Sequence, residues 1–223
     1  LLTAMAETNG RAESIHRNSS VAAPLKVPER PAVVFSPGQH PERPPSIDLI
    51  AEEAISSPEL FHAPDASLTT ASNDGILEIK YNAGSQWGCG VLFYGPKSLA
   101  VGRGPKNATD LDGYSSLVLD AEIPEGLSIE IIVDEAGTDE KAMPDYNIAA
   151  GDDGESFIFN TIEGTGKRST FKLNFKDLQP RITWGNQKGF RRVDMHAMKG
   201  IGLYIRGGYG EGTVKLYSLK LVR

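Results

Sequence analysis

From about residue 70 to the C-terminus, the sequence repeats one pattern: short apolar runs separated by Gly, Asn, Asp or Pro. Within the runs, apolar residues alternate with polar ones. This alternation predicts β-strands, and their close spacing is typical of an all-β sandwich. Segments with a helical period are almost absent. The sequence predicts two stacked antiparallel sheets, and the runs expected to form strands are 75–81, 89–94, 98–103, 115–121, 127–134, 155–160, 169–175, 200–206 and 213–222.

The first 65 residues have a different composition, because seven of the 14 prolines fall between Pro24 and Pro45 and aromatic residues are nearly absent. Such a segment cannot bury enough apolar surface to offset its chain entropy, so residues 1–65 are predicted to form an irregular Pro-rich tail or linker. Within it, residues 47–56 could form a short amphipathic helix. The first six residues end in an Ala-x-Ala pattern like the end of a secretory signal, which predicts a secreted, extracellular protein.

Composition excludes several classes of partner. The net charge is −6, with 23 basic and 29 acidic residues and no basic block, so nucleic acid is not expected as a partner. No run approaches the roughly 20 consecutive apolar residues of a membrane-spanning helix, so membrane insertion is not expected. Cys89 is the only cysteine. An intrachain disulfide and a thiolate zinc site are therefore excluded, and we expect Cys89 to be a small buried hydrophobe.

Alternation also predicts which side chains point away from the core. In two of the predicted strands, Glu130, Asp134, Tyr204 and Arg206 lie opposite the apolar positions, and they share one outer face if these strands belong to the same sheet. Tyr94 also projects away from the apolar positions of its strand and is free to line a surface. Sugars are held by flat aromatic rings and by planar polar groups that bond adjacent hydroxyls. The set therefore predicts a sugar-binding face.

A Gly-punctuated loop at 181–194 supplies more residues of these types, namely Trp184, Asn186 and Arg191. Loops positioned by a rigid sandwich are where binding residues concentrate, so we expect these three to contact the ligand. The alternative is that Trp184 closes one end of the sandwich while the arginines pair with nearby acids. Trp87 continues the alternation of the strand that follows it, which predicts that it packs in the core.

Acidic residues cluster in two predicted loops, at 134–140 and 152–155. Two carboxylates held about 5 to 10 Å apart could hydrolyse a glycosidic bond, but acid clusters in Gly-containing loops are ordinarily solvated. Oxygen-rich loops also suit Ca²⁺, although no spaced D-x-D-x-D-G loop occurs. Nucleophile-elbow and phosphate-loop motifs are absent. We expect no catalytic residue and no cofactor, with a structural calcium ion of unidentified ligands as the remaining metal alternative.

Several segments follow one another in a recognisable order: YSSLVLD (114–120), IEIIVD (129–134), the segment 171–178, WGN (184–186), LYI (203–205) and a closing strand at 212–221. This order resembles the galactose-binding-like jelly rolls that act as carbohydrate-binding modules. Such modules are appended to bacterial plant-polysaccharide hydrolases such as cellulases, mixed-linkage glucanases and mannanases. Complex I intermediate-associated domains have a similar architecture. The resemblance covers about residues 70–223.

The resemblance implies a noncatalytic β-sandwich that holds a polysaccharide, a β-glycan such as glucan or mannan, along its concave sheet. It also implies that the module targets an attached glycoside hydrolase to that polysaccharide. Glu130, Asp134, Tyr204 and Arg206 would then be cleft residues, with Trp184 as a platform on a loop.

The sequence departs from this pattern in its last strand. The terminal strand of such modules often carries an acidic pair that helps to hold a structural calcium ion, whereas here the matching stretch is VKLYS at 214–218. Two other functions stay open. One is a small β-sandwich glycosidase or lyase that uses the acidic loops or Tyr and Arg chemistry in the cleft. The other is a protein-interaction domain of a cell-surface protein.

Overall fold

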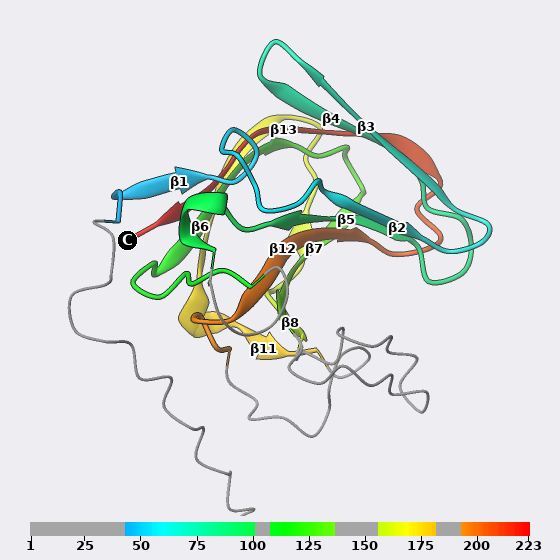
Figure 1. Cartoon of the computed structure of the whole chain (residues 1–223). Coiled ribbons are helices and arrows are strands. Elements are labelled where there is room, and N and C mark those ends of the chain that lie inside the picture. The colour runs from blue at the N-terminus through cyan, green and yellow to red at the C-terminus, as the bar shows by residue number, and fades with distance from the viewer. Residues whose placement is uncertain (1–42, 101–107, 137–155, 182–192) are drawn as a thin grey trace, which may run out of the picture. The chain divides into compact units, whose positions relative to one another are not determined.

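The computed structural model describes residues 43–100, 108–136, 156–181 and 193–223, and all of them belong to one compact unit. These residues form two antiparallel sheets and, among themselves, no α-helix (Figure 1). The predicted all-β sandwich is therefore confirmed. Across the described ranges, the structure contains no helix with the length and apolar character needed to cross a membrane.

The first sheet has six strands in the order β10–β6–β13–β4–β3, and the short strand β1 pairs with β13. All of its pairings are antiparallel. Its strands are β1 (Ser46–Asp48), β3 (Ser67–Asn73), β4 (Ile76–Asn82), β6 (Ser116–Glu122), β10 (Arg168–Asn174) and β13 (Glu211–Val222).

The second sheet has seven strands in the order β11–β8–β7–β12–β5–β2, and β9 pairs with β7. Two short 3-10 helices, Lys97–Leu99 and Phe175–Asp177, follow β5 and β10. The strands of this sheet are β2 (Glu59–His62), β5 (Cys89–Tyr94), β7 (Ser128–Glu135), β8 (Ser156–Ile158), β9 (Ile162–Glu163), β11 (Gln179–Pro180) and β12 (Met198–Ile205).

The core lies between the two sheets and is filled by the alternate apolar positions that the sequence predicts. Because successive side chains of a strand point to opposite faces, every second residue of the central strands enters this layer. The second sheet contributes Cys89, Val91, Phe93, Ile129, Ile131, Val133, Ile201, Leu203 and Ile205, and the first sheet contributes Ile79, Leu117, Leu119, Val214, Leu216, Leu219 and Leu221.

The sandwich begins earlier in the chain than the sequence suggests. Strand β1 pairs with β13 and β2 pairs with β5, although both come from the predicted tail. The predicted helix at 47–56 is wrong, because Ile47 is buried within β1 and the chain then turns. Here the sheet pairing overrides the local amphipathic pattern. The predicted strand at 98–103 is also wrong over residues 98–100, which the 3-10 helix occupies in part; residues 101–107 lie outside the described residues.

The buried thiol of Cys89 gives a simple chemical test of the core. Burial raises the pKa of Cys89 to about 11, since the apolar surroundings disfavour the thiolate. At pH 8, a thiol with this pKa carries about one hundredth of the thiolate of an ordinary cysteine. We expect the folded protein to react with a disulfide reagent at least about 100-fold more slowly than the protein in denaturant. A native rate equal to the denatured rate would show that Cys89 is accessible.

Candidate functional site

The sequence-predicted site residues come together on the outer face of the second sheet. Strand β12 lies between β7 and β5, so Tyr204 is flanked by Glu130 on β7 and by Gly90 on β5. Asp134 lies on the same face as Glu130, two positions of the alternation further along β7, and Arg206 follows the end of β12. These side chains therefore stand outside the core layer, as alternation predicts.

Two of these residues are covered, contrary to the exposed cleft that the sequence predicts. Tyr204 is only 7% exposed and Glu130 only 3%. The ring of Phe61 stacks beside that of Tyr204, with centroids 6.3 Å apart and planes 18° apart, and the guanidinium of Arg181 lies 5.0 Å from the Tyr204 ring centroid. Alternation predicts the face on which a side chain lies, but neighbouring side chains on that face decide whether it is exposed.

Glycines on β5 and β12 allow this covering layer to lie flat on the sheet. A Cβ atom at Gly90 would stand 2.5 Å from Cζ of Phe61, and one at Gly202 would stand 2.6 Å from Cγ1 of Ile132. Both distances are shorter than real Cβ contacts, so a side chain at either position would displace the neighbouring side chain that crosses the strand. Phe61 can therefore reach from the edge strand β2 across β5 toward Tyr204.

Trp87 extends this layer to the solvent, which corrects the prediction that it packs in the core. Its side chain is 47% exposed, and its ring stacks beside Phe61 with centroids 6.4 Å apart and planes 19° apart. The alternation of β5 does not reach back to Trp87 because Gly88 has a φ of +107° and turns the chain before Cys89. We call Trp87, Phe61 and Tyr204 the aromatic row.

Polar groups hold the aromatic row in place and border it. The Tyr204 hydroxyl donates a hydrogen bond to the backbone carbonyl of Trp87, and burial raises the pKa of Tyr204, so this hydroxyl keeps its proton. The carboxylate of Glu130 accepts a hydrogen bond from Nε of Arg206 and forms an ion pair with Nη2 of the same residue, whose side chain is otherwise exposed. The site thus presents an open indole ring beside an exposed guanidinium that is fixed by a buried carboxylate.

The other predicted residues of this face lie further along the sheet. Tyr94 and Asp134 flank Gly200 from the two sides of β12. Tyr94 is only 9% exposed, so its predicted role as a free surface ring is wrong, and its hydroxyl donates to Glu59 over 2.8 Å. Nζ of Lys199 lies 3.5 Å from the same Glu59 oxygen. This end of the face is a closed polar network rather than an open ring surface.

The loop residues Trp184, Asn186 and Arg191 lie outside the described residues, as do the acidic residues of 137–155. Their predicted roles stay predictions. Within the described part of the chain, no group of three or more His, Cys, Asp or Glu side chains is arranged to hold a metal ion.

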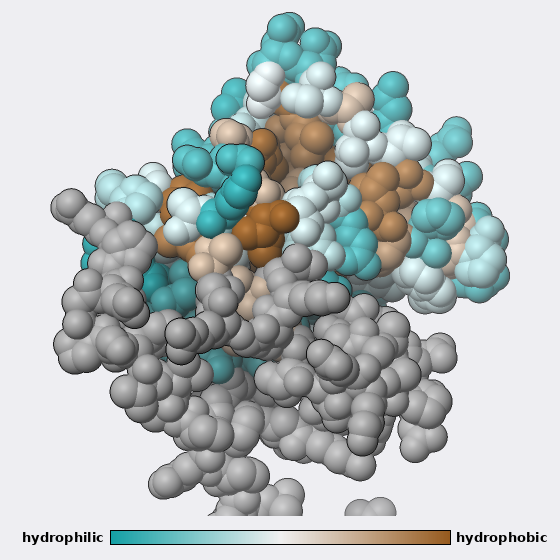
Figure 2. Space-filling model, in the orientation of Figure 1, coloured by the Kyte–Doolittle hydropathy of each residue, from teal (hydrophilic) through white to brown (hydrophobic). Residues whose placement is uncertain are grey.

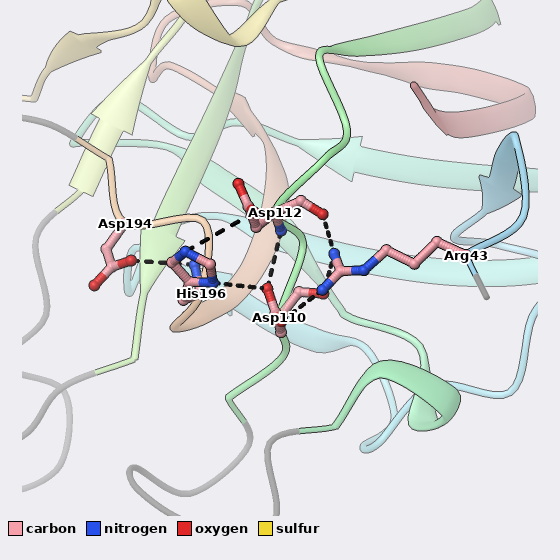
Figure 3. Close-up of polar contacts among 5 residues, drawn as sticks. All are labelled: Arg43, Asp110, Asp112, Asp194 and His196. Carbon is pink, nitrogen blue, oxygen red and sulfur yellow. Dashed lines mark hydrogen bonds and ion pairs between the residues drawn. The ribbon is translucent and has the colours of Figure 1, made fainter. Parts of the chain in front are cut away.

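A separate polar cluster joins the start of the described chain to two loops of the sandwich (Figure 3). Arg43 Nη2 donates to Asp110 Oδ2 over 2.5 Å, and Arg43 also donates to the carbonyl of Asp112. Nδ1 of His196 lies 3.1 Å from Asp110 Oδ1, and the His196 amide donates to Asp194. The Asp110 carboxylate contacts Arg43 through one oxygen and His196 through the other. The cluster therefore fastens Arg43 to the sandwich and has a structural role.

Sequence reasoning missed two residues of the site, Phe61 and Arg181. Phe61 lies in the segment predicted to be a tail, and Arg181 begins the loop predicted at 181–194. The pattern ELFH at 59–62 contains two apolar residues between charged or polar ones, which is a weak strand signal at the end of the Pro-rich segment. No sequence signal predicts that Arg181 lies over Tyr204.

Comparisons with known proteins show the fold. No family model matches the chain, and no curated protein matches it. Among solved structures, the family 11 carbohydrate-binding module of a cellulosomal cellulase of Clostridium thermocellum is similar with a TM-score of 0.55 at 13% identity, covering 79% of this chain and 94% of that one. The Clostridium thermocellum family 11 module in complex with a β-1,3-1,4-mixed-linked tetrasaccharide is similar with a TM-score of 0.56 at 13% identity, covering 79% and 95%. The chain therefore has the jelly-roll β-sandwich fold of these modules, as the resemblance implied.

Proposed function

We propose that this chain is a noncatalytic module that binds a polysaccharide along the outer face of its second sheet. The observation that carries the proposal is the aromatic row, in which an exposed Trp87 ring continues the nearly parallel rings of Phe61 and Tyr204. An exposed, rigidly supported ring of this kind stabilises the apolar face of a sugar ring. The neighbouring Arg206 offers planar donors to its hydroxyls.

The size of the site indicates modest affinity. One stacking contact contributes about 0.5 to 1.5 kcal/mol beyond area burial, and polar contacts mostly replace hydrogen bonds to water. Dissociation constants from about a micromolar to about a millimolar are therefore expected. Affinity in this range suits a module that raises the local concentration of an attached hydrolase on a polymer with many repeated sites.

We propose a β-glucan as the ligand class, because one of the two similar modules is described in complex with a β-1,3-1,4-mixed-linked tetrasaccharide. An attached glycoside hydrolase and an extracellular location belong to the same proposal.

The site supports binding better than it supports cleavage or protein association. Hydrolysis needs two carboxylates across a cleft, whereas the Glu130 carboxylate is buried and bonded to Arg206. A protein partner is favoured by a broad apolar patch. On the face in view in Figure 2, apolar residues form separate patches among hydrophilic ones, one of them over β2. The large apolar side chains exposed among the described residues are Leu60, Trp87 and Tyr209.

Affinity electrophoresis tests this proposal. The purified chain is run in native gels that contain mixed-linkage β-glucan, xylan or galactomannan, and in a gel without polysaccharide. We expect retarded migration in the mixed-linkage glucan gel and no release of reducing sugar from any of the polymers. Unretarded migration in every gel would overturn glycan binding, and retardation in xylan or galactomannan alone would overturn the β-glucan assignment.

A further inference from the structure

The strand β3 forms an unprotected edge of the first sheet. Edge strands are normally protected by charges, prolines or short length, because their free backbone groups can pair with another chain. The other edges follow this rule: β10 carries Arg168 and Lys172, β11 has only two residues and includes Pro180, and β2 has four residues and includes Glu59. Strand β3 has seven residues, SLTTASN, without a charge or a proline.

The turn that follows β3 determines which of its backbone groups are free. Asp74 and Gly75 both have positive φ, at +50° and +78°, which matches a two-residue hairpin turn of type I′. Its closing pair, Asn73 and Ile76, is hydrogen-bonded, so by alternation the N–H and C=O groups of Leu68, Thr70 and Ser72 point away from β4. Among the described residues, no backbone hydrogen bond outside the β3–β4 ladder reaches these three residues.

We propose that β3 is a dimerisation edge, which pairs antiparallel with β3 of a second copy of this chain across a two-fold axis at Thr70. Thr70 is the middle residue of the strand, so this register pairs all seven residues. Thr70 lies opposite Thr70 of the partner subunit, and Leu68 lies opposite Ser72 of the partner subunit. The pairing forms about six backbone hydrogen bonds and joins the two six-stranded sheets into one.

Charges on the neighbouring strand β4 favour a second copy over an unrelated extended segment. In the hairpin, Glu78 lies beside Ala71 and Lys80 lies beside Thr69. In the dimer, Ala71 lies beside Thr69 of the partner subunit, so each row runs from Glu78 across two short side chains to Lys80 of the partner subunit. Each row spans three strand spacings of about 4.8 Å each. The long side chains of Glu78 and of Lys80 of the partner subunit largely bridge this distance. Lys80 forms no ion pair with the other described residues, and Glu78 lies opposite Lys215 of β13, whose Nζ is 3.2 Å from Oε1 of Glu122.

Sedimentation velocity of the whole chain tests the edge. A small interface made of one strand pair predicts a dimer with a dissociation constant of about 10 to 500 µM, so the wild type is measured from about 5 µM to about 1 mM. Thr70→Lys places two like charges at the two-fold axis, and we expect it to be monomeric throughout. Thr170→Lys, the same substitution at an exposed position of the opposite edge strand β10, is the matched control and should dimerise like the wild type.

Charge reversal tests the register. Lys80→Glu alone and Glu78→Lys alone each create like-charge rows, and we expect each to weaken the dimer by about tenfold. An equimolar mixture of the two variants restores opposite charges in both rows and should form a heterodimer at wild-type concentrations. Thermal unfolding of each variant checks that it is folded. A wild type that stays monomeric at all concentrations, as when another segment occupies the edge, would overturn the proposal, and so would a dimer unaffected by Thr70→Lys.

Discussion

Replacing Trp87 with alanine should weaken polysaccharide binding by tenfold or more while leaving the fold intact. The substitution removes the exposed end of the aromatic row, which is the ring surface available to a sugar. Loss of stacking and of the apolar area buried with it amounts to about 1.5 to 2 kcal/mol of binding free energy. Because a large part of Trp87 is already exposed, the free energy of unfolding should fall by only about 1 kcal/mol or less. Retardation in glucan-containing gels and isothermal titration calorimetry measure the binding, and thermal unfolding measures the stability.

The matched control for this variant is Leu60→Ala. Leu60 is also a large exposed apolar residue close to the aromatic row, but alternation along β2 directs it to the opposite side from Phe61. Its replacement should leave migration in the glucan gel unchanged. Equal binding by the wild type and Trp87→Ala, or equal losses in both variants, would show that the aromatic row is not the sugar-binding surface.

Replacing Gly88 with alanine should destabilise the protein by about 3 to 5 kcal/mol and should also abolish binding. Two effects combine at this position. The φ of +107° is rarely adopted by a residue with a side chain, and a Cβ atom would overlap the backbone oxygen of Ile205 on β12. The overlap involves backbone on both sides, so it cannot be relieved by rotating a side chain. Denaturant unfolding monitored by tryptophan fluorescence measures the loss of stability.

Gly113→Ala separates the two effects. Gly113 also has a positive φ, +88°, but a Cβ atom there would meet nothing within 4 Å. Only the backbone strain applies, and the expected loss of stability is about 1 to 2 kcal/mol, with unchanged glucan binding. If the two alanine variants lose the same stability, the close approach of Gly88 to β12 contributes nothing. In that case Gly88 does not determine where Trp87 lies.

Strand alternation in the sequence predicts both the sandwich and the direction of its side chains. The alternate apolar residues of the strands around Val91, Ile131 and Leu203 predict a common core, and these residues are buried there. The same alternation predicts that Glu130 and Tyr204 lie on one outer face, where they are direct neighbours in the register. These predictions succeed because the period of a strand is a local property of the chain that its own residues encode.

The exposure of each ring on that face depends instead on how distant segments pack against one another. Tyr204 is covered because Phe61 arrives from a strand 143 positions earlier in the sequence and lies across Gly90, while Trp87 is exposed because the chain turns at Gly88. These outcomes depend on contacts between segments that are distant along the chain. The alternation of apolar and polar residues within one strand therefore cannot predict them. The strand order β12–β5–β2 places Phe61 and the loop before β5 close to Tyr204. This arrangement is the physical reason why an exposed indole ring, rather than the predicted tyrosine, forms the open part of the site.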